Sequence, residues 1–312
     1  MRRVGFVVGA VSVFLVVGGG SALALPVPVL HPQERAEENP VTVQHPSPDR
    51  PLIAVAHRGA SGHAPENTLA ALNTAKRLGA RTVEIDVQLT SDDEIVLMHD
   101  TTLERTTNAT EVFPDRDSYE VGDFTLEEVE QLEAGSWFDP VFEGEPVPTL
   151  DIALDLLETL DLNLFLEIKD PDLSAGIEDL VAEEISTRST WLEHNPPWEP
   201  RRLVVQSFDW ESMEYSKTLL PSVPHALLGL VSKEEITDYD WAHMINPNHT
   251  QIDADYVEAV HEAGLEITPY TINDRTVMDA VLEMGTDGFI TDFPEVGLEA
   301  IRDFEGAELV AH

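Results

Sequence analysis

The chain contains no cysteine, so disulfide bonds, zinc–thiolate sites and cysteine nucleophiles are all excluded. Basic side chains are also scarce: 18 lysines and arginines stand against 59 aspartates and glutamates, for a formal net charge of −41. Such a surface repels nucleic acid and anionic lipid headgroups, and we therefore expect no nucleic-acid partner. An anionic small-molecule substrate would need a local source of positive charge. A bound cation would supply one.

The amino terminus is typical of an export signal. Arg2 and Arg3 precede an apolar run at residues 4–17, and a small-x-small cleavage site ends at Ala24. We expect residues 1–24 to be a signal peptide cleaved near Ala24. The mature protein would then be secreted or extracytoplasmic, without stable membrane insertion. The alternative is an uncleaved membrane anchor, because the apolar run is nearly long enough to span a bilayer.

The next segment is rich in proline, with seven prolines between Pro26 and Pro51. Proline cannot donate a backbone hydrogen bond and disrupts helix interiors, so residues 25–51 are interpreted as an extended linker. The folded domain is predicted to cover residues 52–312. An apolar fraction of 42% across the chain is enough to build a buried core.

Short apolar runs alternate with amphipathic segments through this domain. Eight runs are predicted as strands: residues 52–56, 82–87, 163–168, 202–206, 225–230, 243–252, 265–270 and 287–291. Helices are predicted between most of them, for example at residues 68–78, 150–160, 210–220, 254–263 and 275–284. This alternation indicates an α/β fold with a parallel sheet, and eight strands favour a closed (β/α)8 TIM barrel. No glycine-rich dinucleotide motif follows the first strand, which argues against an open sheet.

One segment breaks the alternation. The segment 82–90 is followed, after only three polar residues, by another apolar run at residues 94–98, and a parallel crossover needs a dozen or more. We therefore expect residues 94–98 to return antiparallel as a β-hairpin, which would bring His99 back to the end of the second strand. Residues 101–148 are predicted to form a small, loop-rich insertion before the third barrel strand.

Two carboxylates lie on one face of the second strand. Glu84 and Asp86 are two residues apart, and strand side chains alternate faces with a period of two. Burying such a pair is costly unless a cation, a proton or a basic side chain compensates. Glu167 adds a third carboxylate from a neighbouring strand, and three oxygen ligands suit Ca²⁺ or Mg²⁺. The alternative is an ion-pair network with Arg58 and Lys169.

Two histidines are predicted at strand ends, His57 after the first strand and His99 after the hairpin. Imidazole suits proton transfer near neutral pH, although a lone histidine at a strand end is usually structural. Arg58 and Lys169 would add positive charge where a phosphate could bind. The segment around Asn67 predicts the start of a helix, with Asn67 as its cap.

Eight short segments that carry these residues follow one another in a fixed order. They are His57-Arg58-Gly59, Pro65-Glu66-Asn67-Thr68, Glu84-Ile85-Asp86-Val87, His99-Asp100, Glu167-Ile168-Lys169, Gln206-Ser207-Phe208, Tyr270-Thr271-Ile272-Asn273 and Gly288-Phe289-Ile290-Thr291-Asp292. Each is weak alone, but the ordered set closely resembles the glycerophosphodiester phosphodiesterase family. The resemblance covers residues 52–300. Tyr270 stands where the family often has tryptophan, a departure that bears on substrate packing.

The resemblance implies a TIM barrel with a small inserted region after the hairpin. It also implies hydrolysis of a glycerophosphodiester, a small-molecule substrate, to sn-glycerol 3-phosphate and an alcohol. One divalent cation would be held by Glu84, Asp86 and Glu167. We favour Ca²⁺, because it is plentiful outside cells, with Mg²⁺ as the alternative.

The resemblance also implies roles for the basic residues. His57 and His99 would act as the general base and the general acid. Arg58 and Lys169 would help to hold the phosphate.

Two other functions use a similar set of residues. Phospholipase D-like lyases acting on lysolipids or sphingolipids share the barrel and the metal–histidine arrangement, but they tend to carry a disulfide-tied loop that this chain cannot form. A barrel that binds phosphodiesters or cations without turnover is the other alternative. It is weakened because neither histidine and none of the three carboxylates is replaced. The sequence does not indicate an oligomeric state.

Overall fold

The structure, a computed structural model, describes residues 50–311. The predicted signal peptide and almost all of the predicted linker lie outside these residues. Within the described part, no helix is both long enough and apolar enough to cross a membrane.

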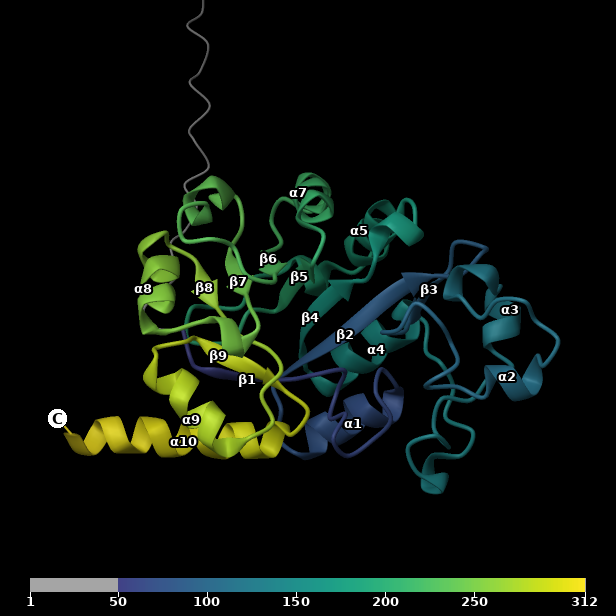
Figure 1. The fold of residues 1–312 in the computed structure, drawn as a ribbon, viewed down its shortest axis with the longest axis horizontal. Coiled ribbons are helices and arrows are strands. Elements are labelled where there is room, and N and C mark those ends of the chain that lie inside the picture. Colours follow the sequence, from purple (N-terminus) through teal and green to yellow (C-terminus); the bar gives the residue numbers. More distant parts are fainter. Residues whose placement is uncertain (1–49, 312) are drawn as a thin grey trace, which may run out of the picture. The chain divides into compact units, whose positions relative to one another are not determined.

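Eight parallel strands form the centre of the described domain (Figure 1). They are β1 (Ile53–Ala56), β2 (Thr82–Leu89), β4 (Asn163–Ile168), β5 (Leu203–Ser207), β6 (His225–Leu228), β7 (Met244–Asn246), β8 (Glu266–Ile267) and β9 (Gly288–Thr291). Neighbouring strands follow the order β8-β7-β6-β5-β4-β2-β1-β9. Backbone hydrogen bonds bridge the remaining gap, from Asp287 to Ile267 at 3.0 Å and from Ile290 to Pro269 at 2.9 Å. The predicted (β/α)8 barrel is thus confirmed.

Helices surround the strands (Figure 1). They are α1 (Leu69–Arg77), α4 (Leu150–Leu160), α5 (Ile177–Ser186), α6 (Ser189–Leu192), α7 (Trp210–Leu219), α8 (Ala254–Glu262), α9 (Arg275–Glu283) and α10 (Pro294–Ala311). Short 3-10 helices lie in the connections: η1 (Val121–Asp123), η2 (Pro140–Phe142), η3 (Pro171–Leu173), η4 (Ile236–Tyr239) and η5 (His249–Gln251). The five predicted helices are present.

The two faces of the barrel strands bury different side chains. Ile85 and Leu166 point outward and join the large hydrophobic cluster between strands and helices, whereas Phe165 and Val204 fill the barrel interior. Glu84 pairs in register with Phe165 across β2 and β4. The alternation of faces therefore directs the acidic side chains of β2 into the barrel, as the sequence predicts.

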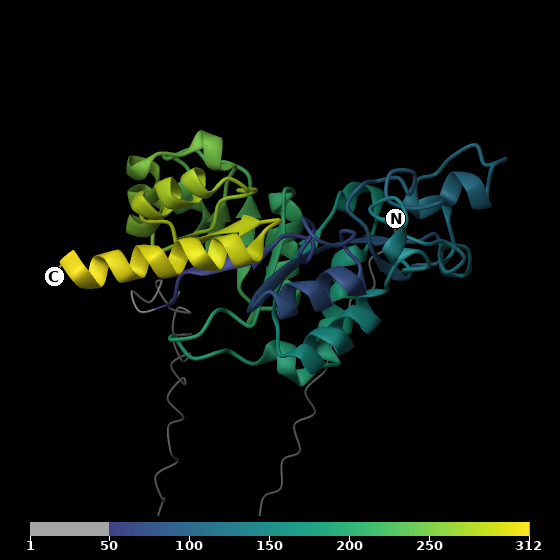
Figure 2. The ribbon, with the colours of Figure 1, turned by 90° about the horizontal axis from the view of Figure 1, so that it is seen from below.

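A hairpin and an inserted segment follow β2. The short strand β3 (Ile95–Leu97) pairs antiparallel with the end of β2. The segment 101–148 contains two four-residue helices, α2 (Ala109–Val112) and α3 (Leu126–Val129), and has its own hydrophobic cluster around Phe124. Figures 1 and 2 both show it beside the end of the hairpin, away from α10.

A buried histidine in β6 gives the fold a pH dependence. His225 is fully buried, with Nδ1 2.9 Å from the carbonyl oxygen of Val223 and Nε2 3.0 Å from the hydroxyl of Ser216. A carbonyl can only accept, so Nδ1 carries the proton and Nε2 accepts from Ser216. Burial lowers the pKa of His225 to about 3. The folded chain therefore holds this imidazole neutral.

We expect this histidine to destabilise the fold as the pH falls. The usual pKa of histidine is 6.5, so below that pH the unfolded chain binds a proton at this residue. The folded chain does not bind it until about pH 3. The free energy of unfolding should therefore fall by up to about 1.4 kcal/mol per pH unit, or by about 2 kcal/mol between pH 7 and pH 5. Urea unfolding of the wild type and of His225→Asn over this range measures it. The stability advantage of the wild type should shrink with falling pH, and parallel curves would contradict the expectation.

Candidate functional site

A cavity of about 170 Å³ lies where the barrel strands end. Six of the seven predicted site residues line it: His57, Arg58, Glu84, His99, Glu167 and Lys169. The seventh, Asp86, is fully buried and lies directly opposite Glu167 in the register of β2 and β4. The structure thus brings all seven residues to one end of the barrel.

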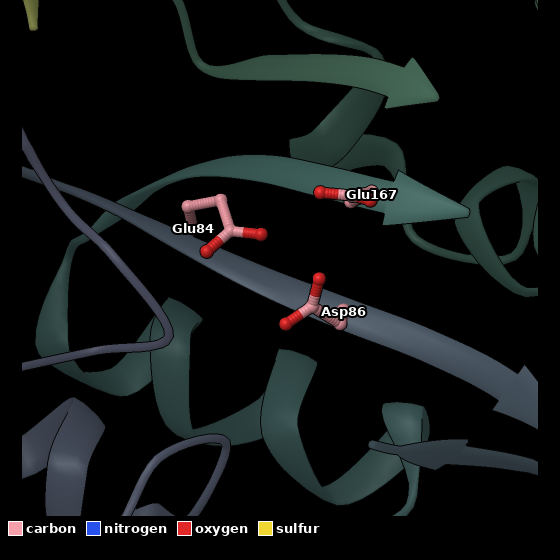
Figure 3. Close-up of side chains that lie close together, drawn as sticks. All are labelled: Glu84, Asp86 and Glu167. Carbon is pink, nitrogen blue, oxygen red and sulfur yellow. The ribbon is translucent and has the colours of Figure 1, made fainter. Parts of the chain in front are cut away.

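The three carboxylates converge inside the barrel. Glu84 and Asp86 project from β2 and Glu167 projects from β4 (Figure 3). One oxygen from each lies within 4.8 Å of the others. All three side chains are buried, so the cluster is shielded from bulk water.

Each carboxylate is held by the protein through one of its oxygens. The backbone N–H of Arg58 donates to Glu84 Oε2 at 2.8 Å, and Asn67 Nδ2 donates to Asp86 Oδ2 at 2.8 Å. Lys169 Nζ donates to Glu167 Oε1 at 2.7 Å. Among the described residues, Glu84 Oε1 and Asp86 Oδ1 are buried without a hydrogen-bond partner. Unpartnered buried carboxylate oxygens are costly, and this arrangement fits a divalent cation with hard oxygen ligands.

Burial and the repulsion between the carboxylates shift the pKa values of this cluster. Burial, together with the charges of Asp86 and Glu167, raises the pKa of Glu84 well above its usual value. Burial and the charge of Asp86 raise the pKa of Glu167 to about 8. Burial also opposes ionisation of Asp86, but Arg58 and Lys169 hold its pKa below the usual range. Arg58 and Lys169 therefore do not supply enough positive charge to keep all three carboxylates ionised.

The ion pairs with Arg58 and Lys169, which the sequence offers as the alternative to a cation, are present beside this cluster. Arg58 Nε lies 3.4 Å from Asp86 Oδ2, and Lys169 Nζ lies 3.9 Å from Asp86 Oδ1. Arg58 adopts a left-handed backbone with a φ of 52°, and Gly59 follows with a φ of 80°. A Cβ atom on Gly59 would lie 2.7 Å from the backbone of Ala71, so only glycine fits this turn. The turn aims the backbone N–H of Arg58 at Glu84.

His57 is oriented by a carboxylate from the far end of the chain. Its Nδ1 lies 2.6 Å from Asp292 Oδ1, and Ser61 and Asn273 also donate to Asp292. Burial opposes ionisation of Asp292, but these hydrogen bonds, led by that of His57, keep its pKa below the usual range. An ionised carboxylate can only accept, so Nδ1 of His57 carries the proton. The lone pair of Nε2 is then free to accept a proton.

His99 has a similar partner beside it in the sequence. Its Nδ1 lies 2.8 Å from Asp100 Oδ1. Hydrogen bonds from Arg105 hold the pKa of Asp100 well below its usual range, so Asp100 is an anion that accepts from His99. Burial lowers the pKa of His99, which makes its imidazolium form a stronger proton donor.

The prediction that Asn67 caps a helix is wrong. The cap of α1 is Thr68, whose hydroxyl accepts from the backbone N–H of Ala71 at 3.2 Å. Asn67 has a φ of 55°, a left-handed conformation that asparagine tolerates better than most residues. Its side chain binds the backbone and the carboxylate of Asp86 instead.

Sequence reasoning also left Asp100, Asp292 and Glu66 without roles. All three stand inside the segments on which the family resemblance rests, but the sequence does not indicate what they contact. The pairing of His57 with Asp292 joins residues 235 positions apart. Only the closure of the barrel brings them together.

Comparisons with known proteins agree with this geometry. The sequence profile of the glycerophosphoryl diester phosphodiesterase family matches residues 57–296. A glycerophosphodiester phosphodiesterase of Caldanaerobacter subterraneus is 35% identical over 80% of this chain and 98% of its own, and one of Bacillus subtilis is 33% identical over 80% and 86%.

Solved structures give the same result. An Oleispira antarctica phosphodiesterase, solved with the product sn-glycerol-3-phosphate, is 31% identical and superposes with a TM-score of 0.67 over 80% of this chain and 97% of its own. A glycerophosphodiester phosphodiesterase of Agrobacterium tumefaciens is 28% identical with a TM-score of 0.65 over 78% and 98%. With its fold, its ordered segments and the match over residues 57–296, this chain belongs to the glycerophosphodiester phosphodiesterase family.

Proposed function

We propose that the protein hydrolyses glycerophosphodiesters to sn-glycerol 3-phosphate and an alcohol, using one divalent cation and two histidines. The observation that carries the proposal is the convergence, at one cavity, of two histidine–aspartate pairs and three buried carboxylates, two of which (Glu84 and Asp86) have an oxygen without a hydrogen-bond partner. The product complex of the Oleispira phosphodiesterase supports this choice of substrate class.

Glu84, Asp86 and Glu167 would hold the cation. Their carboxylates are hard ligands that suit Ca²⁺ or Mg²⁺, and we favour Ca²⁺ for a protein expected to act outside the cell. When bound, the cation supplies positive charge that offsets the carboxylates and the phosphodiester. This would also allow an anionic substrate to approach a protein of net charge −41.

The side chains around the carboxylates supply the remaining chemistry. Arg58 and Lys169 bind the phosphodiester oxygens, and His57 removes a proton from the nucleophile through Nε2. The nucleophile oxygen bonds to phosphorus, and the bond from phosphorus to the departing alcohol oxygen breaks as His99 gives that oxygen a proton. The nucleophile is either water or the glycerol 2-hydroxyl, whose cyclic phosphate is then hydrolysed. Both routes end in the same products.

Release of sn-glycerol 3-phosphate from glycerophosphocholine tests the proposal. We expect an enzyme-coupled assay to detect it with added Ca²⁺ or Mg²⁺ and to lose the signal when a chelator is added. Lysophosphatidylcholine serves as the parallel substrate: choline release from it, without turnover of glycerophosphocholine, would indicate the lyase instead. Binding of glycerophosphocholine without any product would indicate a binding barrel.

A further inference from the structure

Arg105 of the inserted segment joins two loops of the candidate site. Its Nε and Nη2 donate to the two oxygens of Asp100 at 2.5 and 2.8 Å. Its Nη1 and Nη2 donate to the two oxygens of Glu66 at 2.8 and 2.7 Å. Asp100 follows the hairpin, whereas Glu66 lies in the connection from β1 to α1. The guanidinium group therefore forms paired hydrogen bonds to two carboxylates at once.

Both carboxylates also contact residues with proposed catalytic roles. Asp100 Oδ1 accepts from His99 Nδ1 at 2.8 Å, and Glu66 Oε1 accepts from Arg58 Nη1 at 2.7 Å. The result is a continuous series of contacts from His99 through Asp100, Arg105 and Glu66 to Arg58. Arg105 is at its centre, yet it does not line the cavity.

We propose that Arg105 is a positioning residue that fixes the orientation of His99 through Asp100, which rests on the acid role of His99 proposed above. Arg58 has further anchors, since its guanidinium also pairs with Asp86 and its backbone N–H binds Glu84. His99 has Asp100 as its hydrogen-bond partner on Nδ1. Loss of Arg105 should therefore disturb proton donation more than phosphate binding.

The shape of the arginine side chain suits this task. A guanidinium presents its donors in a rigid planar fork, which matches two carboxylates held in fixed positions. A lysine ammonium carries the same charge on a flexible stem without the fork. The side chain of Arg105 is 43% exposed, so the ion pairs alone contribute little to stability, and a small guanidinium ion could enter its place.

The test compares Arg105→Ala and His99→Ala on two esters. Choline leaves glycerophosphocholine as an alkoxide that needs a proton, whereas p-nitrophenolate leaves glycerophospho-p-nitrophenol without one. We expect Arg105→Ala to lower kcat on the choline ester by about 10- to 100-fold with little change in KM, and to lower it far less on the p-nitrophenyl ester. Guanidinium ion at non-denaturing concentration should restore part of the lost turnover.

Arg116→Ala is the matched control. Arg116 lies in the same inserted segment and pairs with Glu128, away from the cavity, so turnover of both esters should remain that of the wild type. Thermal melting of every variant reports on folding. If Arg105→Ala melts too early to assay, Arg105→Lys gives the same comparison, because it keeps the charge without the fork.

The outcomes separate this inference from the proposed function. The inference is overturned if His99→Ala is impaired and Arg105→Ala is not, or if Arg105→Ala affects both esters equally while His99→Ala affects mainly the choline ester. If His99→Ala hydrolyses both esters normally, the acid role of His99 is wrong and the inference falls with it. The inference is supported if both Arg105→Ala and His99→Ala lose turnover mainly on the choline ester and guanidinium ion restores part of the turnover of Arg105→Ala.

Discussion

Replacing either His57 or His99 by alanine is expected to lower the turnover of glycerophosphocholine by about 10²-fold or more, a typical contribution of general acid–base catalysis. Both imidazoles line the cavity. In each, Nδ1 is hydrogen-bonded to a carboxylate oxygen, at 2.6 Å in His57 and 2.8 Å in His99. That contact fixes the ring and leaves Nε2 for proton transfer. Initial rates at saturating cation and substrate measure the effect.

His261 provides the control for this experiment. It also pairs with an aspartate, with Nε2 3.0 Å from Asp287 Oδ2, but it lies on α8 and does not line the cavity. His261→Ala should retain the turnover of the wild type. Wild-type turnover in both His57→Ala and His99→Ala would reject their catalytic roles, whereas equal losses in all three variants would point to a general effect of removing a histidine.

Replacing Glu84 by glutamine is expected to have opposite effects on stability and on function. Without a cation, Glu84 is buried beside two other carboxylates, and its raised pKa reflects that cost. Glutamine is neutral without taking up a proton, so it avoids that cost, and the cation-free variant should melt at a higher temperature than the wild type. Its turnover should fall by about 10²-fold or more, because one ligand of the cation is lost.

The response to added Ca²⁺ is the decisive measurement. A ligand present at 100 times its Kd stabilises the folded state by about 2.7 kcal/mol. Added Ca²⁺ should increase the stability of the wild type by this amount and should increase that of Glu84→Gln only slightly. Glu266→Gln is the control, because Glu266 is a buried glutamate on β8 that already accepts two hydrogen bonds from Arg201 at 2.8 Å. It should lose stability and keep the Ca²⁺ response. An equal Ca²⁺ response in Glu84→Gln would contradict the assignment of Glu84 as a ligand.

The sequence predicts those parts of the site that depend on strands. A period of two places Glu84 and Asp86 on one face of β2, and the structure confirms that both point into the barrel beside Glu167. His99 reaches the same cavity because β3 turns back along β2. Regular geometry makes such positions readable without knowledge of the rest of the chain.

The parts that depend on loops could not be predicted in the same way. Asn67 looks like a helix cap until its left-handed backbone is known, because the same residue type serves both purposes. Asp292 meets His57, and Arg105 meets Glu66, only after distant connections have been folded against each other.

The division between strands and loops has a consequence for how this enzyme could diversify. The acidic ligands are fixed by β2 and β4, which are buried and bonded to neighbouring strands on both sides. Changes in the length or sequence of the connections around the cavity would therefore alter the space available to the departing alcohol. The cation ligands would stay in place. New headgroup preferences could therefore arise by exchange of connections that carry none of the residues proposed for catalysis, with the three cation ligands unaltered.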